Sequence, residues 1–301
     1  MLIGRREALL ALVGLLAACK GRDAPGDGAR ARVVSISPST TEAVFAIGSG
    51  ADLVGRSRHC DFPPEAAKLP VVGGYADPSV EAILALAPTL VVGARGPAGP
   101  SLEQTLRGHS IATYFPETES MDQITAAILE LGRLLQRDTG ARAVVDAITA
   151  RVRSVTQSAA NRARVKVVLL FDMAPIVAAG PGGFPDELLR LAGGANVVVA
   201  GGAYPTFGLE HLLALDPDVI LDGFSDSHDG AASKGVLGQR DAPGWRDLRA
   251  MREGRVRVLD SSAALRPGPR IGEGLEAIAR ALHGEAWSGA PETPPIPKAA
   301  P

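Results

Sequence analysis

An internal repeat constrains this fold more than any other feature of the sequence. Residues 75–88 read YADPSVEAILALAP and residues 204–217 read YPTFGLEHLLALDP, so they align without a gap at a constant offset of 129 positions. Each stretch ends in proline and is followed by an apolar run, at residues 90–92 and 219–221. Because proline ends helices and short apolar runs suit buried strands, each copy predicts a helix followed by a strand. Two copies of one unit predict two similar lobes.

The polar residues of the repeat also match. Tyr75 aligns with Tyr204, and Glu81 aligns with Glu210. A carboxylate in the first turn of a helix gains ~0.3–1 kcal/mol from the helix dipole, so a single glutamate here would be structural. Duplication at equivalent sites instead suits a partner with two matching cationic patches. The tyrosines precede the helices, in loops at the carboxyl ends of parallel strands, where ligands bind.

Short β-branched runs alternate with helical patterns on both sides of a long helical stretch. Residues 121–160 contain no proline and predict two helices, broken near residues 138–140, the second covering about residues 141–160. The pattern predicts an α/β protein with two Rossmann-like lobes, each with a parallel sheet, joined by one long backbone α-helix. The expected strands are residues 33–36, 53–54, 71–72, 90–92, 165–171, 196–199, 219–221 and 255–259, and the other expected helices are residues 39–47, 78–86, 101–107 and 271–282. The first of these helices is predicted to start at a capping box, Ser39 to Glu42.

The ends of the chain differ from its middle. Arg5 and Arg6 precede a short apolar run that ends in Leu-Ala-Ala-Cys19, which predicts a secretory signal peptide and resembles a bacterial lipobox. We therefore expect Cys19 to be diacylated; an ordinary signal peptide and twin-arginine export stay open. The expected parts are a signal peptide (1–18), the lipidated cysteine and a flexible tether (19–31), an N-terminal α/β lobe (32–119), a helical linker (120–163), a C-terminal α/β lobe (164–284) and a disordered proline-rich tail (285–301).

Composition and missing motifs argue against two functional classes. The 31 basic and 33 acidic residues nearly cancel, which argues against a nucleic-acid-binding surface. The sequence has no Gly-x-Ser-x-Gly and no His-Glu-x-x-His, so an enzyme, such as a metal-dependent hydrolase, is disfavoured. A scaffold or adhesion lipoprotein would not need the duplicated carboxylates. With Cys19 lipidated, Cys60 cannot form an internal disulfide; it is either a small buried side chain or a ligand contact.

Four stretches resemble one known family. They are residues 33–48 (VVSISPSTTEAVFAIG), residues 60–65 (CDFPPE), the duplicated glutamate segments, and residues 245–276 with their LRPGPR motif. Together they resemble the helical-backbone (class III) periplasmic substrate-binding proteins of ABC importers, in particular the vitamin B12-binding group. The resemblance covers nearly all of residues 32–284. It implies a monomer that is anchored to the membrane by lipid only, in the periplasm or on the cell surface, with no catalytic residues, resident cofactor or metal.

The resemblance also implies residue roles. Glu81 and Glu210 would dock on the permease dimer. The residues expected to contact the ligand are Phe62, Tyr75, Tyr204, Trp245 and Arg270. The expected ligand is cobalamin or a related corrinoid, although Ala94 stands where an aromatic residue is expected. Haem is the alternative, because Tyr75 could supply a phenolate to ferric iron, with His59 or His211 as a second ligand. A ferric siderophore ranks third, since anionic siderophores call for several cleft cations and only Arg58, Arg95, Arg266 and Arg270 are candidates.

Overall fold

The protein is described by a computed structural model covering residues 30–95, 99–223, 235–259, 262–284 and 287. The predicted signal peptide, Cys19, nearly all of the tether and most of the tail lie outside the described residues. No helix among the described residues is long and apolar enough to cross a membrane.

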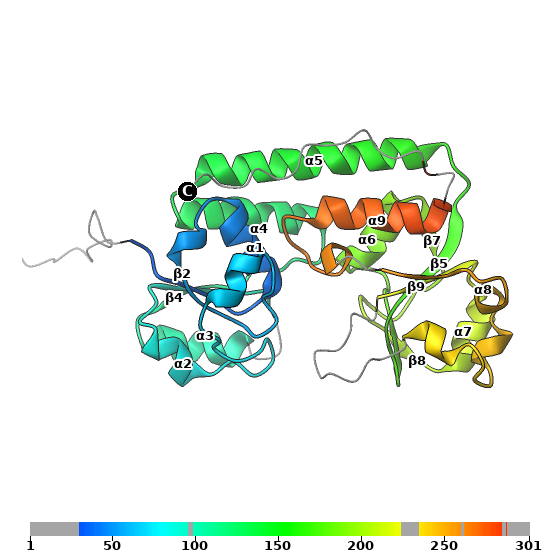
Figure 1. The fold of residues 1–301 in the computed structure, drawn as a ribbon, viewed down its shortest axis with the longest axis horizontal. Helices are drawn as coiled ribbons and strands as arrows, with labels where there is room; N and C mark the ends of the chain where they lie inside the picture. The colour runs from blue at the N-terminus through cyan, green and yellow to red at the C-terminus, as the bar shows by residue number, and fades with distance from the viewer. Residues whose placement is uncertain (1–29, 96–98, 224–234, 260–261, 285–286, 288–301) are drawn as a thin grey trace, which may run out of the picture. The chain divides into compact units, whose positions relative to one another are not determined.

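The N-terminal lobe contains a four-stranded parallel sheet in the order β2-β1-β3-β4 (Figure 1). Its strands are β1 (Val33–Ser35), β2 (Leu53–Arg56), β3 (Leu90–Val92) and β4 (Ala112–Tyr114), and its helices are α1 (Pro38–Ala46), α2 (Val80–Ala85) and α3 (Gly99–Gly108). The strands are buried along most of their length because helices cover the sheet, as parallel sheets require. Ile83 of α2 and Leu106 of α3 are fully buried in this core.

The C-terminal lobe contains a mixed sheet in the order β10-β9-β5-β6-β8, with β7 also paired to β5. Its strands are β5 (Val165–Met173), β6 (Ile176–Ala178), β7 (Gly194–Asn196), β8 (Thr206–Phe207), β9 (Val219–Asp222) and β10 (Val256–Val258). The predicted parallel pairing holds for β5, β7, β9 and β10, whereas β6 runs antiparallel to β5 and β8. Only Ala174 and Pro175 separate β5 from β6, and so short a connection joins only antiparallel strands.

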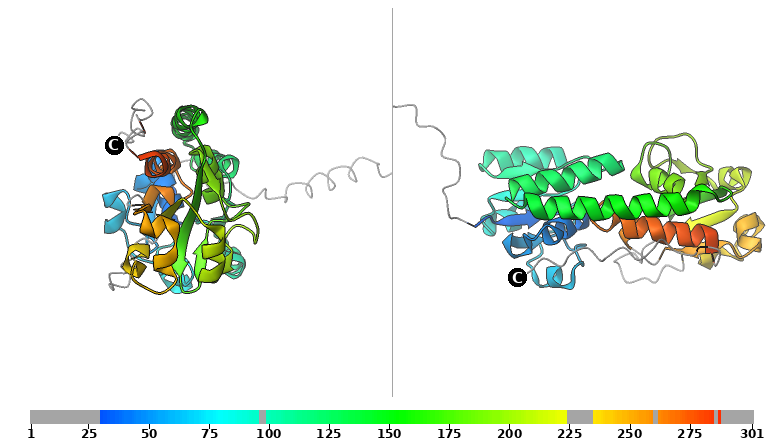
Figure 2. Two further views of the ribbon diagram at one scale, coloured as in Figure 1. Left: turned by 90° about the vertical axis from the view of Figure 1, so that its right-hand side faces the viewer. Right: turned by 90° about the horizontal axis from the view of Figure 1, so that it is seen from above.

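Helices α4 (Met121–Leu134) and α5 (Asp138–Ala160) form the linker, and α6 (Phe184–Leu191) and α9 (Ile271–His283) pack with α5. At 23 residues, α5 is about 35 Å long and runs alongside both lobes (Figures 1 and 2). The predicted long backbone helix is therefore confirmed. It begins three residues earlier than expected, at Asp138, because the break between the helices falls at residues 135–137. The remaining helices are α7 (Leu209–Leu215) and α8 (Arg249–Arg252).

Three local predictions are wrong. Helix α1 begins at Pro38 after Ser37, so Ser39 is not the N-cap and Glu42 does not complete a capping box. Proline suits the first helical position, because it has no N–H to leave unpaired there. The expected strand at 71–72 forms only an isolated bridge to Arg56, and the strand expected at 196–199 lies instead at 194–196.

Residue 287 is ordered although the sequence places it in a disordered tail. The Trp287 side chain is buried and stacks on His283, with ring centroids 5.6 Å apart, and the Arg162 guanidinium lies 5.3 Å from its ring centre. This residue therefore packs on α9 and the end of α5.

The sequence repeat extends to the backbone. Gly73 and Gly202, 129 positions apart, have φ angles of 104° and 82°. Ala87 and Asp216, also 129 positions apart, have φ angles of 44° and 45°, which non-glycine residues rarely adopt. In both lobes the repeated helix leads to a strand beside the lobe's first strand: β3 pairs with β1, and β9 pairs with β5. The two segments are therefore two copies of the same structural unit.

Candidate functional site

The two repeated tyrosines face a common group of polar residues. The Tyr75 hydroxyl donates to the backbone oxygen of Arg95 at 2.7 Å, and the Tyr204 hydroxyl donates to Glu119 Oε2 at 2.9 Å. Tyr204 also packs against Phe171 at the end of β5, with ring centroids 5.8 Å apart. Since Tyr75 comes from the N-terminal lobe and Tyr204 from the C-terminal lobe, this group of residues joins the lobes.

Both phenols remain protonated at neutral pH. Burial raises the pKa of Tyr75, and the negative charges of Glu119 and Glu117 raise it further. Burial is also the main cause that raises the pKa of Tyr204, followed by its hydrogen bond to Glu119. Glu119 acts on the pKa of both tyrosines and Glu117 on that of Tyr75, so the site presents neutral hydroxyls beside negative charge.

Each of the four arginines that could bind an anionic ligand is paired with a carboxylate. Arg58 pairs with Asp77 at 2.8 Å, and Arg95 pairs with Glu117 at 2.8 Å. The other two pairings join residues distant in sequence: Arg270 binds Glu42, and Arg266 binds both Glu42 and Asp61. These pairs neutralise all four candidate cations, and Glu119 adds a further negative charge at Tyr204.

Among the aromatic residues predicted to contact the ligand, Phe62 is the second most exposed, after Tyr204. Its side chain is 41% exposed, and its ring lies over the Arg270 guanidinium, with 4.0 Å between the guanidinium carbon and the ring centre. Arg270 itself is mostly buried. One face of the Phe62 ring is thus occupied by Arg270, which also binds Glu42. The contact of Arg270 with a ligand stays a prediction.

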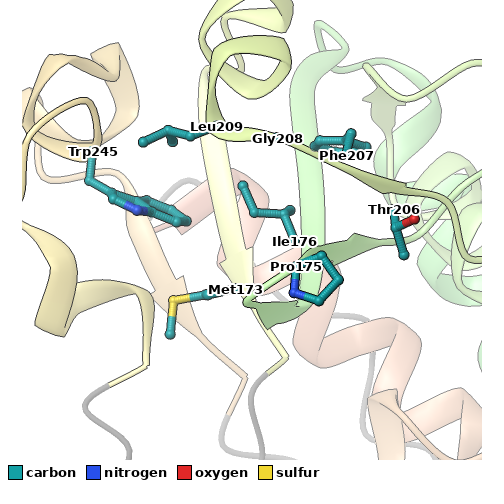
Figure 3. Close-up of a pocket in the computed structure, with 8 residues that line it drawn as sticks. All are labelled: Met173, Pro175, Ile176, Thr206, Phe207, Gly208, Leu209 and Trp245. Atoms are coloured by element: carbon teal, nitrogen blue, oxygen red, sulfur yellow. The ribbon is translucent and has the colours of Figure 1, made fainter.

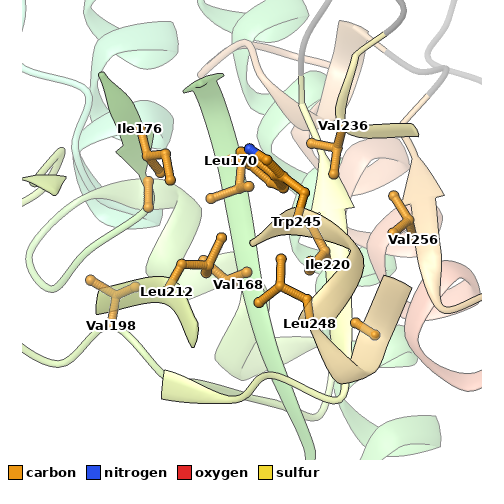
Figure 4. Close-up of a cluster of buried hydrophobic side chains, with 12 residues drawn as sticks. Val168, Leu170, Ile176, Val198, Leu212, Ile220, Val236, Trp245, Leu248 and Val256 are labelled. Atoms are coloured by element: carbon orange, nitrogen blue, oxygen red, sulfur yellow. The ribbon is translucent and has the colours of Figure 1, made fainter. Parts of the chain in front are cut away.

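Trp245 is a core residue that also borders a pocket. It is 7% exposed and belongs to the hydrophobic core of the C-terminal lobe, beside Ile176 and Leu248 (Figure 4). It also lines a pocket of about 350 Å³, together with side chains that include Met173 and Leu209 (Figure 3). Of the five residues predicted to contact a ligand, only Trp245 lines this pocket.

The two repeated glutamates are exposed in the first turns of α2 and α7. The Ser79 hydroxyl caps α2 by accepting from the Ala82 N–H at 3.2 Å, whereas Gly208 precedes α7 without a side-chain cap. Both helices lie on the side of their lobe away from α5 (Figure 1). Glu81 and Glu210 therefore occupy equivalent, solvent-accessible positions in the two lobes.

Three further candidates make no site. Cys60 is fully buried, accepts a hydrogen bond from Thr41 at 3.1 Å, and has a thiol pKa raised by burial, so it is the small buried side chain that the sequence allowed. His211 is exposed and packs edge-on against Phe207. The described residues contain no cluster of three or more histidine, cysteine, aspartate or glutamate side chains suited to a metal ion.

Sequence reasoning missed the acidic members of the site. Glu117 and Glu119 follow β4, at the carboxyl end of a parallel strand, where site residues are expected. That rule could have identified them, but β4 itself was not predicted. Glu42 was assigned to a helix cap, and its partners lie more than 200 residues away.

Comparisons with known proteins agree with this architecture. The model of the periplasmic binding protein family matches residues 33–263. A vitamin B12-binding protein of Vibrio cholerae is 28% identical over 255 residues, covering 82% of this chain and 87% of that protein. A periplasmic haem-binding protein from Roseiflexus sp. RS-1, solved in its apo form, has a TM-score of 0.76 at 27% identity and covers 85% of this chain and 98% of that one. The solved vitamin B12-binding protein of Vibrio cholerae has a TM-score of 0.70 at 25% identity, covering 83% and 96%.

Proposed function

Because the chain belongs to the periplasmic binding protein family, a family of solute-binding proteins, we propose that it captures cobalamin or a related corrinoid between its two lobes and delivers it to the permease of an ABC importer. Tyr75, Tyr204 and Phe62 form the proposed contact surface. Aromatic side chains suit a corrin ring, because they bury large apolar area and stack on flat faces.

The neutralisation of the four candidate arginines is the observation that carries this proposal. Arg58, Arg95, Arg266 and Arg270 are each paired with a carboxylate, and Glu119 adds a negative charge at Tyr204. A carboxylate-bearing ligand would have to displace these partners or sit beside Glu119 without a counter-ion, and an unpaired charge is costly when it leaves water. Cyanocobalamin carries no net charge, so it avoids this cost. Anionic siderophores and the propionates of haem are negatively charged, so their binding would incur this cost.

Haem is the second candidate, because a haem-binding protein is among the structures similar to this chain. In that case Tyr75 would ligate ferric iron as a phenolate. Its raised pKa and its hydrogen bond to Arg95 oppose deprotonation in the unliganded protein. This resistance favours the corrinoid over haem.

Delivery requires docking, which we assign to Glu81 and Glu210. Their exposure, their equivalent positions, and the location of α2 and α7 on the side of each lobe away from α5 (Figure 1) suit a dimeric permease that offers one arginine-bearing surface to each lobe. Membership of the family implies a periplasmic location. Diacylation of Cys19, after removal of residues 1–18, would hold the protein to a membrane through the tether that ends at residue 31.

A titration of the soluble protein, residues 20–301, tests the ligand. Calorimetry with cyanocobalamin should give binding at a one-to-one ratio, and haemin should give no tyrosinate charge-transfer band in the visible spectrum. Binding of haemin with such a band, lost in Tyr75→Phe, together with no heat from cyanocobalamin, would replace the corrinoid by haem.

A further inference from the structure

An ion-pair network centred on the buried carboxylate of Glu42 joins two segments more than 200 residues apart. The Glu42 carboxylate accepts from Arg270 Nη2 at 2.7 Å and Nε at 2.8 Å, and from Arg266 Nη1 at 3.1 Å. Arg266 also donates to both carboxylate oxygens of Asp61, at 2.6 and 3.2 Å. The network contains two carboxylates and two guanidinium groups, so its formal charges balance; Asp61 is exposed, whereas the Glu42 carboxylate is buried and needs such partners.

The network attaches the segment before α9 to the N-terminal lobe. Arg266 and Arg270 lie between the short helix at Ser262–Ala264 and α9, both of which pack in the C-terminal half of the protein. Glu42 lies on α1, and Asp61 lies in the loop after β2. The backbone also approaches α1 closely here, since a Cβ added at Gly268 would lie 3.3 Å from the Ser39 Cα.

Glu42 cannot itself reach a ligand. Its side chain is 1% exposed, whereas Phe62, beside Asp61, is 41% exposed and rests on Arg270. The loop is therefore held at two adjacent residues: Asp61 by an ion pair and Phe62 by a cation–π contact.

We propose that Glu42 and Arg270 are positioning residues for Phe62, and that ligand affinity depends on them although neither contacts the ligand. This inference rests on the proposed function, with Phe62 as a contact for the corrinoid. Glu42 fixes the orientation of the Arg270 guanidinium through two parallel hydrogen bonds. The planar guanidinium then packs against one face of the Phe62 ring. The opposite face of the ring remains for the ligand. The arrangement also assigns a role to Arg270 that differs from direct contact with the ligand's polar rim.

The support can be tested without ligand by hydrogen–deuterium exchange on Arg270→Lys and Glu42→Gln. Lysine keeps the charge beside Glu42 but cannot stack as a plane or donate two parallel hydrogen bonds. We expect faster exchange in residues 58–66 in both variants, and in residues 262–271 as well for Glu42→Gln. Glu276→Gln is the matched control, because it breaks a comparable pair, Arg151–Glu276 at 3.0 Å, between α5 and α9. It should leave residues 58–66 unchanged. Unchanged exchange at 58–66 in Arg270→Lys, which should fold even if Glu42→Gln does not, would overturn the proposal.

A double-mutant cycle tests whether Arg270 acts through Phe62. We expect Phe62→Leu and Arg270→Lys each to raise the dissociation constant for cyanocobalamin about three- to tenfold, which lies within the range of a cation–π contact. The double variant should bind no more weakly than Phe62→Leu alone, because the support has nothing left to position. If the two losses of affinity multiply in the double variant, Arg270 acts independently of Phe62, and its positioning role is refuted. If the wild-type protein does not bind cyanocobalamin, the proposed function fails, and the exchange experiment alone decides whether Phe62 is positioned in this way.

Discussion

The N-terminal and C-terminal copies of the repeated unit share a backbone but not the contacts that hold it. Arg32 closes the turn after α2 by donating to the backbone oxygens of Leu86, at 2.6 Å, and Ala87, at 3.1 Å. Arg249 closes the turn after α7 by donating to the backbone oxygen of Asp216 at 3.2 Å and to its side chain. An arginine does the same task in each lobe, yet the two come from unrelated places in the chain.

This difference supports the roles proposed for the repeated tyrosines and glutamates. The supporting arginines do not follow the 129-residue offset, whereas the tyrosines, the glutamates and the left-handed turns do. A stable turn can be built in several ways, so its supports vary. The exposed glutamates and the tyrosines keep equivalent positions in the two lobes, as the proposed recognition of one ligand and one dimeric partner requires.

The largest effect is expected when the proposed docking residues of both lobes are changed at once. Glu81→Arg combined with Glu210→Arg should reduce corrinoid uptake in cells to background, because each lobe then repels a cationic permease surface. The dissociation constant for cyanocobalamin should change less than twofold. Asp122→Arg with Asp146→Arg, on α4 and α5, makes the same charge change and should leave uptake intact. Lost ligand affinity in the glutamate variant would instead place these residues in the cleft.

The next effect separates the C-terminal core from the ligand site. Trp245→Ala should lower the free energy of unfolding by about 3–5 kcal/mol, because it empties the centre of a packed core. Trp245→Phe should recover most of that stability and bind cyanocobalamin within about twofold of wild type. A large loss of affinity for cyanocobalamin in a stably folded Trp245→Phe variant would show that the ligand binds in the pocket beside Trp245.

The tyrosines test whether the two lobes contribute equally. Tyr75→Ala and Tyr204→Ala should each weaken cyanocobalamin binding about tenfold, equivalent to ~1.4 kcal/mol, since each removes one aromatic contact. Tyr75→Phe and Tyr204→Phe keep the rings and should bind almost normally. An unchanged dissociation constant for one alanine variant would exclude that tyrosine as a contact and make the site one-sided.

The smallest effect concerns the left-handed turns. Ala87→Gly should raise the free energy of unfolding by ~0.5–1 kcal/mol, because glycine relieves the strain of a positive φ angle at some cost in backbone entropy. Asp216→Gly should give no gain, since it also removes the partner of Arg249. Thermal unfolding of both variants compares the lobes directly. Equal gains would show that the Arg249 contact contributes nothing to this turn.

The sequence predicted the long-range plan better than the local details. The repeat, the long helix and most strands followed from apolar periodicity, which records burial directly. Strands β6 and β8 were missed because they contain only three and two residues, too few to show a periodic pattern. Glu42 was misassigned because its spacing from Ser39 fits a local capping box. Its actual partners lie 224 and 228 positions away in the sequence and leave no local signal. Long-range polar contacts of this kind require coordinates.

A crystal structure of the protein with cyanocobalamin tests the central claim most directly. We predict that the corrin lies between the lobes, in contact with Tyr75 and Tyr204, with the Phe62 ring against it and Glu42 still bonded to Arg270. A corrin bound in the pocket beside Trp245, with both tyrosines out of contact, would contradict the account.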